Sequence, residues 1–249
     1  MAAITPGLEP FLFQRGRVGC LLVHGFMGTP WEMLELGQYL ADRQVTALGI
    51  RLEGHATRVQ DLARTDWHDW WESARAGLRQ IQGLCDQVFV AGQSMGGDLA
   101  LHLAAHYPVD GVTALGAPIR LQNPLLRLVR PAKYLVPYVN STEDIHEPVA
   151  KARQPSYRQI PLRSLESLTD LLRHLEDDLG EVRVPALLIQ SRLDRLVPPS
   201  NALYIFDRIS PADKRLVWLE RGGHVVTVDY DKSIVFDEIY HFIAQHAGL

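Results

Sequence analysis

The chain has 249 residues, of which 47% are hydrophobic, and this suits one globular domain or one domain with an insertion. Its formal net charge is −4, which argues against nucleic acid as a partner because phosphate binding needs a basic surface. The two cysteines, Cys20 and Cys85, are too few for a disulfide framework.

Short apolar runs alternate with longer amphipathic stretches along most of the chain. We expect buried strands at residues 18–25, 45–50, 86–94, 109–118, 184–194 and 214–224. Helices are expected at 29–43, 65–85, 95–108, 200–209 and 231–246, the first of them opened by a capping box of Thr29 and Glu32. This alternation predicts an α/β fold with a mostly parallel central sheet and helices on both faces.

The alternation stops between residues 120 and 179. This stretch holds prolines at 124, 131, 137, 148, 155 and 161 and no convincing buried strand. About sixty residues is too long for a plain loop in a compact domain. We expect a small helical cap at 120–179, inserted into a core formed by 1–119 and 180–249.

The stretch AGQSMGG at residues 91–97 places a serine where a predicted strand passes to a predicted helix. A G-x-S-x-G pattern arises by chance in roughly one such sequence in twenty, so its position matters more than its presence. A sharp turn there exposes the hydroxyl of Ser94, and Gly92 and Gly96 leave room for the turn. The following helix directs its N-terminus at the same place. Ser94 is therefore our candidate nucleophile.

A serine nucleophile needs a base, and the base needs an acid to orient it. Asp194 ends the predicted strand ALLIQSRLD, and His224 follows the predicted strand RLVWLE. Both lie downstream of Ser94 in the order serine, acid, histidine, each at a strand end. We therefore expect Ser94, Asp194 and His224 to form the catalytic group.

Other titratable residues are weaker candidates for this role. Asp229 is too close to His224 in the chain, and Asp98 is expected to face solvent or a neighbouring loop. His55 is expected to make a loop hydrogen bond. Surface or packing roles are expected for the remaining candidates, which are His102, His106, Asp177 and Asp178.

The reaction also needs donors for a tetrahedral oxyanion. One is the backbone N–H of Met95, directly after the serine. For the other we choose the N–H of Phe26 in the loop LLVHGFMG, whose His24 is expected to hold the loop in place.

The motifs HGFMG, GQSMGG and GGHVVTVD, together with the strand end at Asp194, resemble the α/β-hydrolase superfamily. Within that superfamily, the chain is similar to bacterial carboxylesterases and monoacylglycerol lipases. The resemblance implies an α/β-hydrolase fold with Ser94 as nucleophile, Asp194 as acid and His224 as base. It also implies that Phe26 and Met95 form the oxyanion hole. At most one strand fits before residue 18, so the sheet is expected to be trimmed at its first edge.

From these observations we expect a serine carboxylesterase that hydrolyses short- to medium-chain esters through an acyl-enzyme. A monoacylglycerol lipase is the alternative, and a C–C hydrolase, a non-enzymatic receptor or an aminopeptidase is less favoured. An aminopeptidase should hold its substrate amine with an acidic pair, for which Glu143 and Asp144 are candidates. No metal motif or cofactor motif is present in the sequence, so neither is expected. We expect a small-molecule ester as substrate, no nucleic acid, and a monomer or homodimer.

No apolar run reaches the roughly 18 residues of a membrane span, and the first 17 residues lack the apolar segment of a secretory signal. The sequence therefore favours a cytoplasmic protein without stable membrane insertion.

Overall fold

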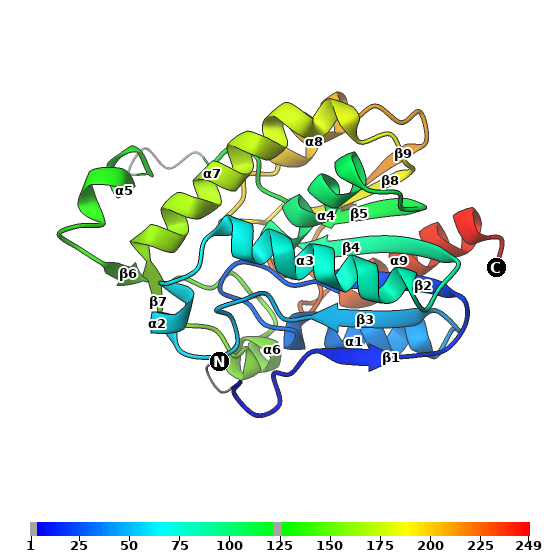
Figure 1. Ribbon diagram of the computed structural model, residues 1–249, viewed down its shortest axis with the longest axis horizontal. Helices are drawn as coiled ribbons and strands as arrows, with labels where there is room; N and C mark the ends of the chain where they lie inside the picture. Colours follow the sequence, from blue (N-terminus) through cyan, green and yellow to red (C-terminus); the bar gives the residue numbers. More distant parts are fainter. Residues whose placement is uncertain (1–3, 122–125) are drawn as a thin grey trace.

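A seven-stranded sheet forms the centre of the computed structural model, which describes residues 4–121 and 126–249 (Figure 1). The strands lie in the order β1-β3-β2-β4-β5-β8-β9. Neighbouring strands run parallel, except that β1 pairs antiparallel with β3. The predicted mostly parallel sheet is confirmed, and among residues 4–17 β1 is the one strand. The strands are β1 (Phe11–Phe13), β2 (Val18–Val23), β3 (Thr46–Ile50), β4 (Gln87–Gln93), β5 (Gly111–Leu115), β8 (Ala186–Ser191) and β9 (Lys214–Leu219).

Helices cover both faces of the sheet, because its central strands are apolar on both sides. Along β2, Leu21 and Val23 belong to one apolar cluster, whereas Cys20 and Leu22 belong to a second cluster on the opposite face. The first cluster packs against α3 (Trp67–Gln82), α4 (Met95–His106) and α8 (Ser200–Arg208). The second packs against α1 (Trp31–Ala41) and α9 (Lys232–Ala247). A short helix, α2 (Val59–Leu62), precedes α3.

The segment between β5 and β8 contains α5 (Leu126–Ala132), β6 (Tyr138–Asn140), α6 (Pro148–Arg153), β7 (Gln159–Pro161), α7 (Leu162–Asp178) and a 3-10 turn, η1 (Leu179–Glu181). In this segment, α5, β6 and β7 lie at one end of the molecule, and α7 runs from there toward α8 (Figure 1). The sequence did not predict the antiparallel pair β6–β7, whose strands are short and largely exposed. Residues 122–125 of the expected cap lie outside the described residues.

The predicted capping box at α1 is wrong. The helix starts after Pro30, no side chain caps it, and Thr29 Oγ1 has no hydrogen-bond partner. Glu32 instead turns into the protein, where its carboxylate accepts from Gly25 N (3.2 Å) and from Gln154 Nε2 (2.9 Å). The N–H group of Gly25 binds the Glu32 carboxylate in place of the helix end. This contact places the carboxyl group of Glu32 beside the candidate site.

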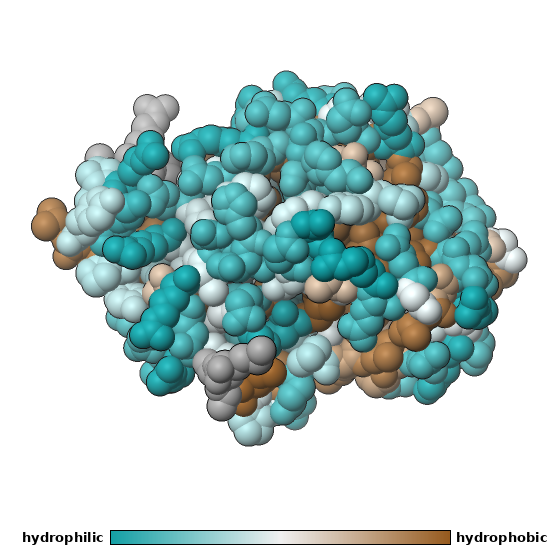
Figure 2. Space-filling model, viewed as in Figure 1, coloured by the Kyte–Doolittle hydropathy of each residue, from teal (hydrophilic) through white to brown (hydrophobic). Residues whose placement is uncertain are grey.

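The surface seen in Figure 2 is mostly hydrophilic, with an apolar tip at the end that carries α5. The segment that follows α5 exposes Tyr134, Leu135 and Val136. Within residues 4–121 and 126–249, no helix combines the length and the apolar character that a membrane span requires.

Candidate active site

Ser94 lies on a sharp turn between β4 and α4. Its backbone has φ +54° and ψ −124°, and residues other than glycine rarely adopt a positive φ of this kind. Ser94 N donates to Leu115 O (2.7 Å), and Ser94 O accepts from Gly97 N (2.7 Å), so both sides of the turn are fixed. A strained, fixed backbone at the carboxyl edge of the sheet presents the hydroxyl to the neighbouring loops.

Two glycines are required by close backbone contacts at this turn. A Cβ atom on Gly92 would lie 2.0 Å from the carbonyl oxygen of Gly96. One on Gly96 would lie 2.2 Å from the carbonyl oxygen of Val23. The glycines therefore leave room for the turn, as the sequence indicated, and Gly96 also lets α4 approach β2.

The structure brings Ser94, His224 and Asp194 together from three strand ends. Ser94 Oγ lies 2.9 Å from His224 Nε2, and His224 Nδ1 lies 2.7 Å from Asp194 Oδ2. Asp194 is 7% exposed and His224 is 6% exposed, so water competes little for these contacts. The hydroxyl, imidazole and carboxylate form one continuous hydrogen-bonded chain.

The surroundings of Asp194 favour its ionised form. Burial by itself would raise the pKa of this carboxyl, but the charge and hydrogen bond of His224, together with the hydrogen bonds of Val197 and Gln190, hold the pKa below its ordinary value. Asp194 Oδ1 also accepts from Leu196 N and Val197 N, and Oδ2 accepts from Gln190 Nε2. Burial alone would lower the pKa of His224, but Asp194 raises it above its ordinary value.

The loop that carries His224 is held by residues whose role the sequence did not reveal. Gln93, next to the serine, donates from Nε2 to the carbonyl oxygen of His224 (2.9 Å). His224 N donates to Asp144 O (2.8 Å). Gln93 thus links the serine turn to the histidine loop. Its position directly before Ser94 was the only sequence signal.

Of the two expected oxyanion donors, Met95 follows the serine directly and Phe26 lines the same pocket. Met95 is the first residue of α4, so its N–H has no acceptor within the helix. Phe26 lines the pocket and packs its ring near Trp70 and His55. His24 holds this loop, since its Nδ1 lies 2.9 Å from Gly25 O and its Nε2 accepts from Leu52 N (3.2 Å).

Among the weaker candidates, Asp98 differs from the prediction. It is fully buried, and neither of its carboxylate oxygens has a hydrogen-bond partner. Burial raises the pKa of this carboxyl well above its ordinary value. Asp98 does not face solvent because α4 packs beneath other helices on this side of the sheet.

The other weaker candidates have structural roles. Asp229 accepts from the backbone N–H groups of His146, Glu147 and Gly223, and so it organises the histidine loop. His55 is buried, and its Nδ1 lies 3.1 Å from Glu53 O, which agrees with the expected loop contact.

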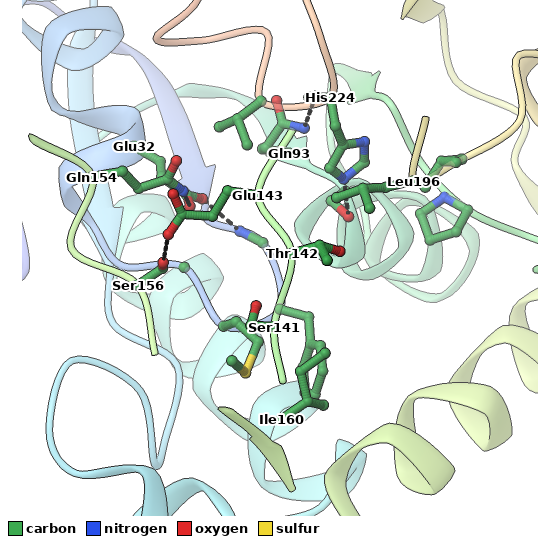
Figure 3. Close-up of a pocket in the computed structure, with 18 of the residues that line it drawn as sticks. Glu32, Gln93, Ser141, Thr142, Glu143, Gln154, Ser156, Ile160, Leu196 and His224 are labelled. Carbon is green, nitrogen blue, oxygen red and sulfur yellow. Dashed lines mark hydrogen bonds between the residues drawn. The ribbon is translucent and has the colours of Figure 1, made fainter. Parts of the chain in front are cut away.

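A pocket of about 180 Å³ opens beside Ser94. Figure 3 shows Glu32, Gln154, Glu143 and Ser156 gathered on one side of it, away from Leu196 and His224. Other parts of the wall are apolar, formed by residues that include Pro118, Leu121, Ile160, Leu168, Leu196 and Val197. The pocket therefore has a polar side and an apolar side, and sequence analysis did not identify the polar residues other than Glu143.

Glu32 and Glu143 are the two carboxyl groups that line this pocket with Ser94. Burial raises the pKa of Glu32 to about 7, although hydrogen bonds from Gly25 and Gln154 oppose this. The candidate acidic pair of Glu143 and Asp144 is not formed in the pocket, because Asp144 accepts at Oδ2 from the backbone N–H of Arg195 (2.8 Å) and is not part of the pocket wall.

Comparisons with known proteins agree with this fold. Residues 15–231 match the Hydrolase_4 family model, described as serine aminopeptidase, S33. The chain is 36% identical over 247 residues to a thermostable monoacylglycerol lipase of Bacillus sp. (strain H-257), with 98% of each chain covered. It is 27% identical to a carboxylesterase of Bacillus subtilis (strain 168), again with 98% of each chain covered. A solved structure from work on the metagenome-derived lipolytic enzymes LipS and LipT has a TM-score of 0.92 and 32% identity, covering 98% of this chain and all of that one.

Proposed function

Because this chain belongs to the Hydrolase_4 family of α/β-hydrolases and is an ester-hydrolysing enzyme, we propose that Ser94, His224 and Asp194 carry out the hydrolysis through an acyl-enzyme. The observation that supports this most directly is the chain of contacts from Ser94 Oγ to His224 Nε2 (2.9 Å) and from His224 Nδ1 to Asp194 Oδ2 (2.7 Å).

The contacts assign a role to each side chain. His224 Nε2 takes the proton of Ser94 as the serine oxygen bonds to the acyl carbon, and the N–H groups of Phe26 and Met95 stabilise the oxyanion. His224 then gives that proton to the leaving alcohol, and a new ester bond joins the acyl group to Ser94. A water molecule then attacks the acyl-enzyme in the same way, with His224 taking its proton and returning it to Ser94, and the carboxylic acid is released. Asp194 keeps Nδ1 protonated and stabilises the imidazolium.

The pocket supports a short- to medium-chain acyl group. Its volume of about 180 Å³ is below the roughly 300–1,000 Å³ of pockets for drug-sized ligands. We propose that the apolar wall near Ile160 and Leu168 receives the acyl chain. Because β7 and α7 supply these residues, the segment 120–179 acts in this proposal as a cap over the core formed by 1–119 and 180–249.

Monoacylglycerol hydrolysis is the second candidate, and the polar side of the pocket favours it. The hydroxyl groups of a glycerol leaving group would find acceptors and donors at Glu143, Gln154 and Ser156. A simple alkyl ester would leave these groups unused. The relative named as a monoacylglycerol lipase adds to the argument for this alternative.

A comparison of two butyrate esters separates the candidates. We expect Glu143→Ala to lower kcat/KM for monobutyrylglycerol at least ten-fold, because a fold-change of that size corresponds to the loss of a hydrogen bond to a charged group. The kcat/KM for methyl butyrate should not change. The matched control is Thr142→Ala, an exposed neighbour in the same wall. Equal effects of Glu143→Ala on both esters would contradict a glycerol-binding role and leave the carboxylesterase assignment.

The catalytic residues all come from one chain, so the proposal needs no second subunit. We propose that the enzyme works as a monomer or a homodimer, and light scattering at the assay concentration distinguishes the two. Each proton and charge in the proposed steps is carried by side chains and backbone groups, so no cofactor enters the scheme.

A further inference from the structure

Two histidines on α4 and one aspartate at the end of α7 form a cluster outside the pocket. His102 and His106 are four residues apart, so they lie on the same face of α4. Asp178 is the last residue of α7, and its Oδ2 lies 2.9 Å from His102 Nδ1 and 3.0 Å from His106 Nε2. One atom from each of the three residues lies within 4.8 Å of the other two.

The Nδ1 atom of His102 faces Asp178 but does not have the geometry of a hydrogen bond to it. The side chain is only 8% exposed, and its Nδ1 makes no hydrogen bond, although Asp178 Oδ2 is 2.9 Å away. The ring is held against Trp71, with their centroids 4.3 Å apart. The nitrogen and the carboxylate oxygen face each other at ion-pair distance, and a cation bound between them would take both as ligands.

The spacing and the ligand types fit a borderline-soft divalent metal ion. Zinc binds imidazole nitrogen and carboxylate oxygen at about 2.0–2.2 Å, so neighbouring ligand atoms lie roughly 3–3.5 Å apart. Two imidazoles favour zinc, cobalt or nickel over magnesium or calcium, which prefer oxygen. A neutral imidazole is the form that binds a metal, and each of the two rings offers one nitrogen to the cluster.

We propose that His102, His106 and Asp178 bind one divalent transition-metal ion of the zinc class, with water at the remaining coordination positions. The side chain of Asp178 is 26% exposed and that of His106 is 44% exposed, so an ion can enter from solvent. The ion joins the end of α7 to α4.

The role of the metal ion is structural. His102 lies eight residues after Ser94, about 12 Å along the helix, so the ion does not reach the ester. However, α4 begins at the residue after Ser94, and Leu168 of α7 lines the pocket. A metal link between the two helices would stabilise the pocket wall relative to the nucleophile.

The test uses protein without a polyhistidine tag that has been stripped of metal with a chelator. We expect one equivalent of Co²⁺ to give a ligand-field absorption band and Zn²⁺ to displace it. At about 100 times its dissociation constant, Zn²⁺ should raise Tm by roughly 5–10 °C. His106→Ala and Asp178→Asn should each weaken binding at least ten-fold. The matched control is His68→Ala, an exposed histidine stacked on Trp67 that should bind as the wild type does.

Three results would overturn the proposal. The first is the absence of both a cobalt band and a Tm shift at 100 µM free metal. The second is metal binding that survives in both His106→Ala and Asp178→Asn. The third is a loss of binding in His68→Ala as large as in those two variants. Ester hydrolysis without added metal, measured for each variant, shows that its fold is intact. Because His106 is partly exposed and Asp178→Asn keeps the side-chain shape, at least one variant is expected to fold.

Discussion

The buried carboxyl group of Glu32 makes a testable contribution to the pH dependence of stability. It lies between the backbone N–H of Gly25 and the amide of Gln154, and burial raises its pKa from 4.5 to about 7. In the unfolded chain this carboxyl loses its proton near pH 4.5. The folded state therefore binds more protons between pH 4.5 and 7, and Glu32 makes stability fall as the pH rises through this window.

The magnitude follows from the shift in pKa. About 2.5 pKa units at 1.36 kcal/mol each give about 3 kcal/mol of stability that is present at pH 4 and lost by pH 8. Glu32→Gln keeps the shape and can still accept from Gly25, but it cannot ionise. We expect the free energy of unfolding of the variant, relative to wild type, to rise by about 3 kcal/mol between pH 4 and pH 8.

Urea unfolding at several pH values measures this difference, because the other titrating groups are the same in both proteins. The matched control is Glu35→Gln, an exposed glutamate on the same helix, whose curve should run parallel to that of the wild type. Parallel pH curves for wild type and Glu32→Gln would refute the reasoning and show that Glu32 ionises normally in the folded protein.

Three further variants test other parts of the structure. Asp98→Asn replaces a buried carboxyl whose pKa is raised. At pH 8 the free energy of unfolding of the variant in urea should exceed that of wild type by roughly 1–3 kcal/mol, and this difference should vanish at low pH. A difference that is the same at every pH would contradict this. Gly96→Ala sets a methyl group against Val23 O, so esterase kcat should fall at least 100-fold, while Gly180→Ala, with open space around it, should match wild type. Asp194→Asn should lower kcat about 10⁴-fold and move the acid limb of the kcat/KM profile to lower pH, because Asp194 holds the pKa of His224 up. An unmoved limb would assign that shift to another group.

Much of the fold was predictable because its strands are buried on both faces. A continuous apolar run such as 18–23 can be buried in few ways other than as a central strand. The ends of the predicted strands and helices lie within a few residues of the observed ends. The proximity of Ser94, Asp194 and His224 was predictable because each follows such an apolar run, and carboxyl ends of parallel strands meet at one edge. The pair β6–β7 could not be predicted, because its strands are three residues long and lack a buried face.

The errors arose where a third element changes the environment of a polar residue. Asp98, His102 and His106 form a polar stripe on an otherwise apolar helix, which is typical of a solvent-facing side. In the structure, α3 and α7 pack on α4, so Asp98 is buried and does not face solvent, whereas the buried His102 agrees with the packing role expected for it. Glu32 was assigned to a helix cap because the sequence cannot show that an unpaired loop N–H lies closer. Tertiary packing decided all of these positions.

The most direct test of the account is the hydrolysis of p-nitrophenyl butyrate by wild type, by Ser94→Ala and by Ser141→Ala. Ser141 is the matched control because its hydroxyl lines the same pocket. The account predicts that Ser94→Ala loses about a million-fold in kcat, or falls to background, whereas Ser141→Ala stays within a few-fold of wild type. Retention of activity in Ser94→Ala to within ten-fold of wild type would contradict the proposal that this serine is the nucleophile.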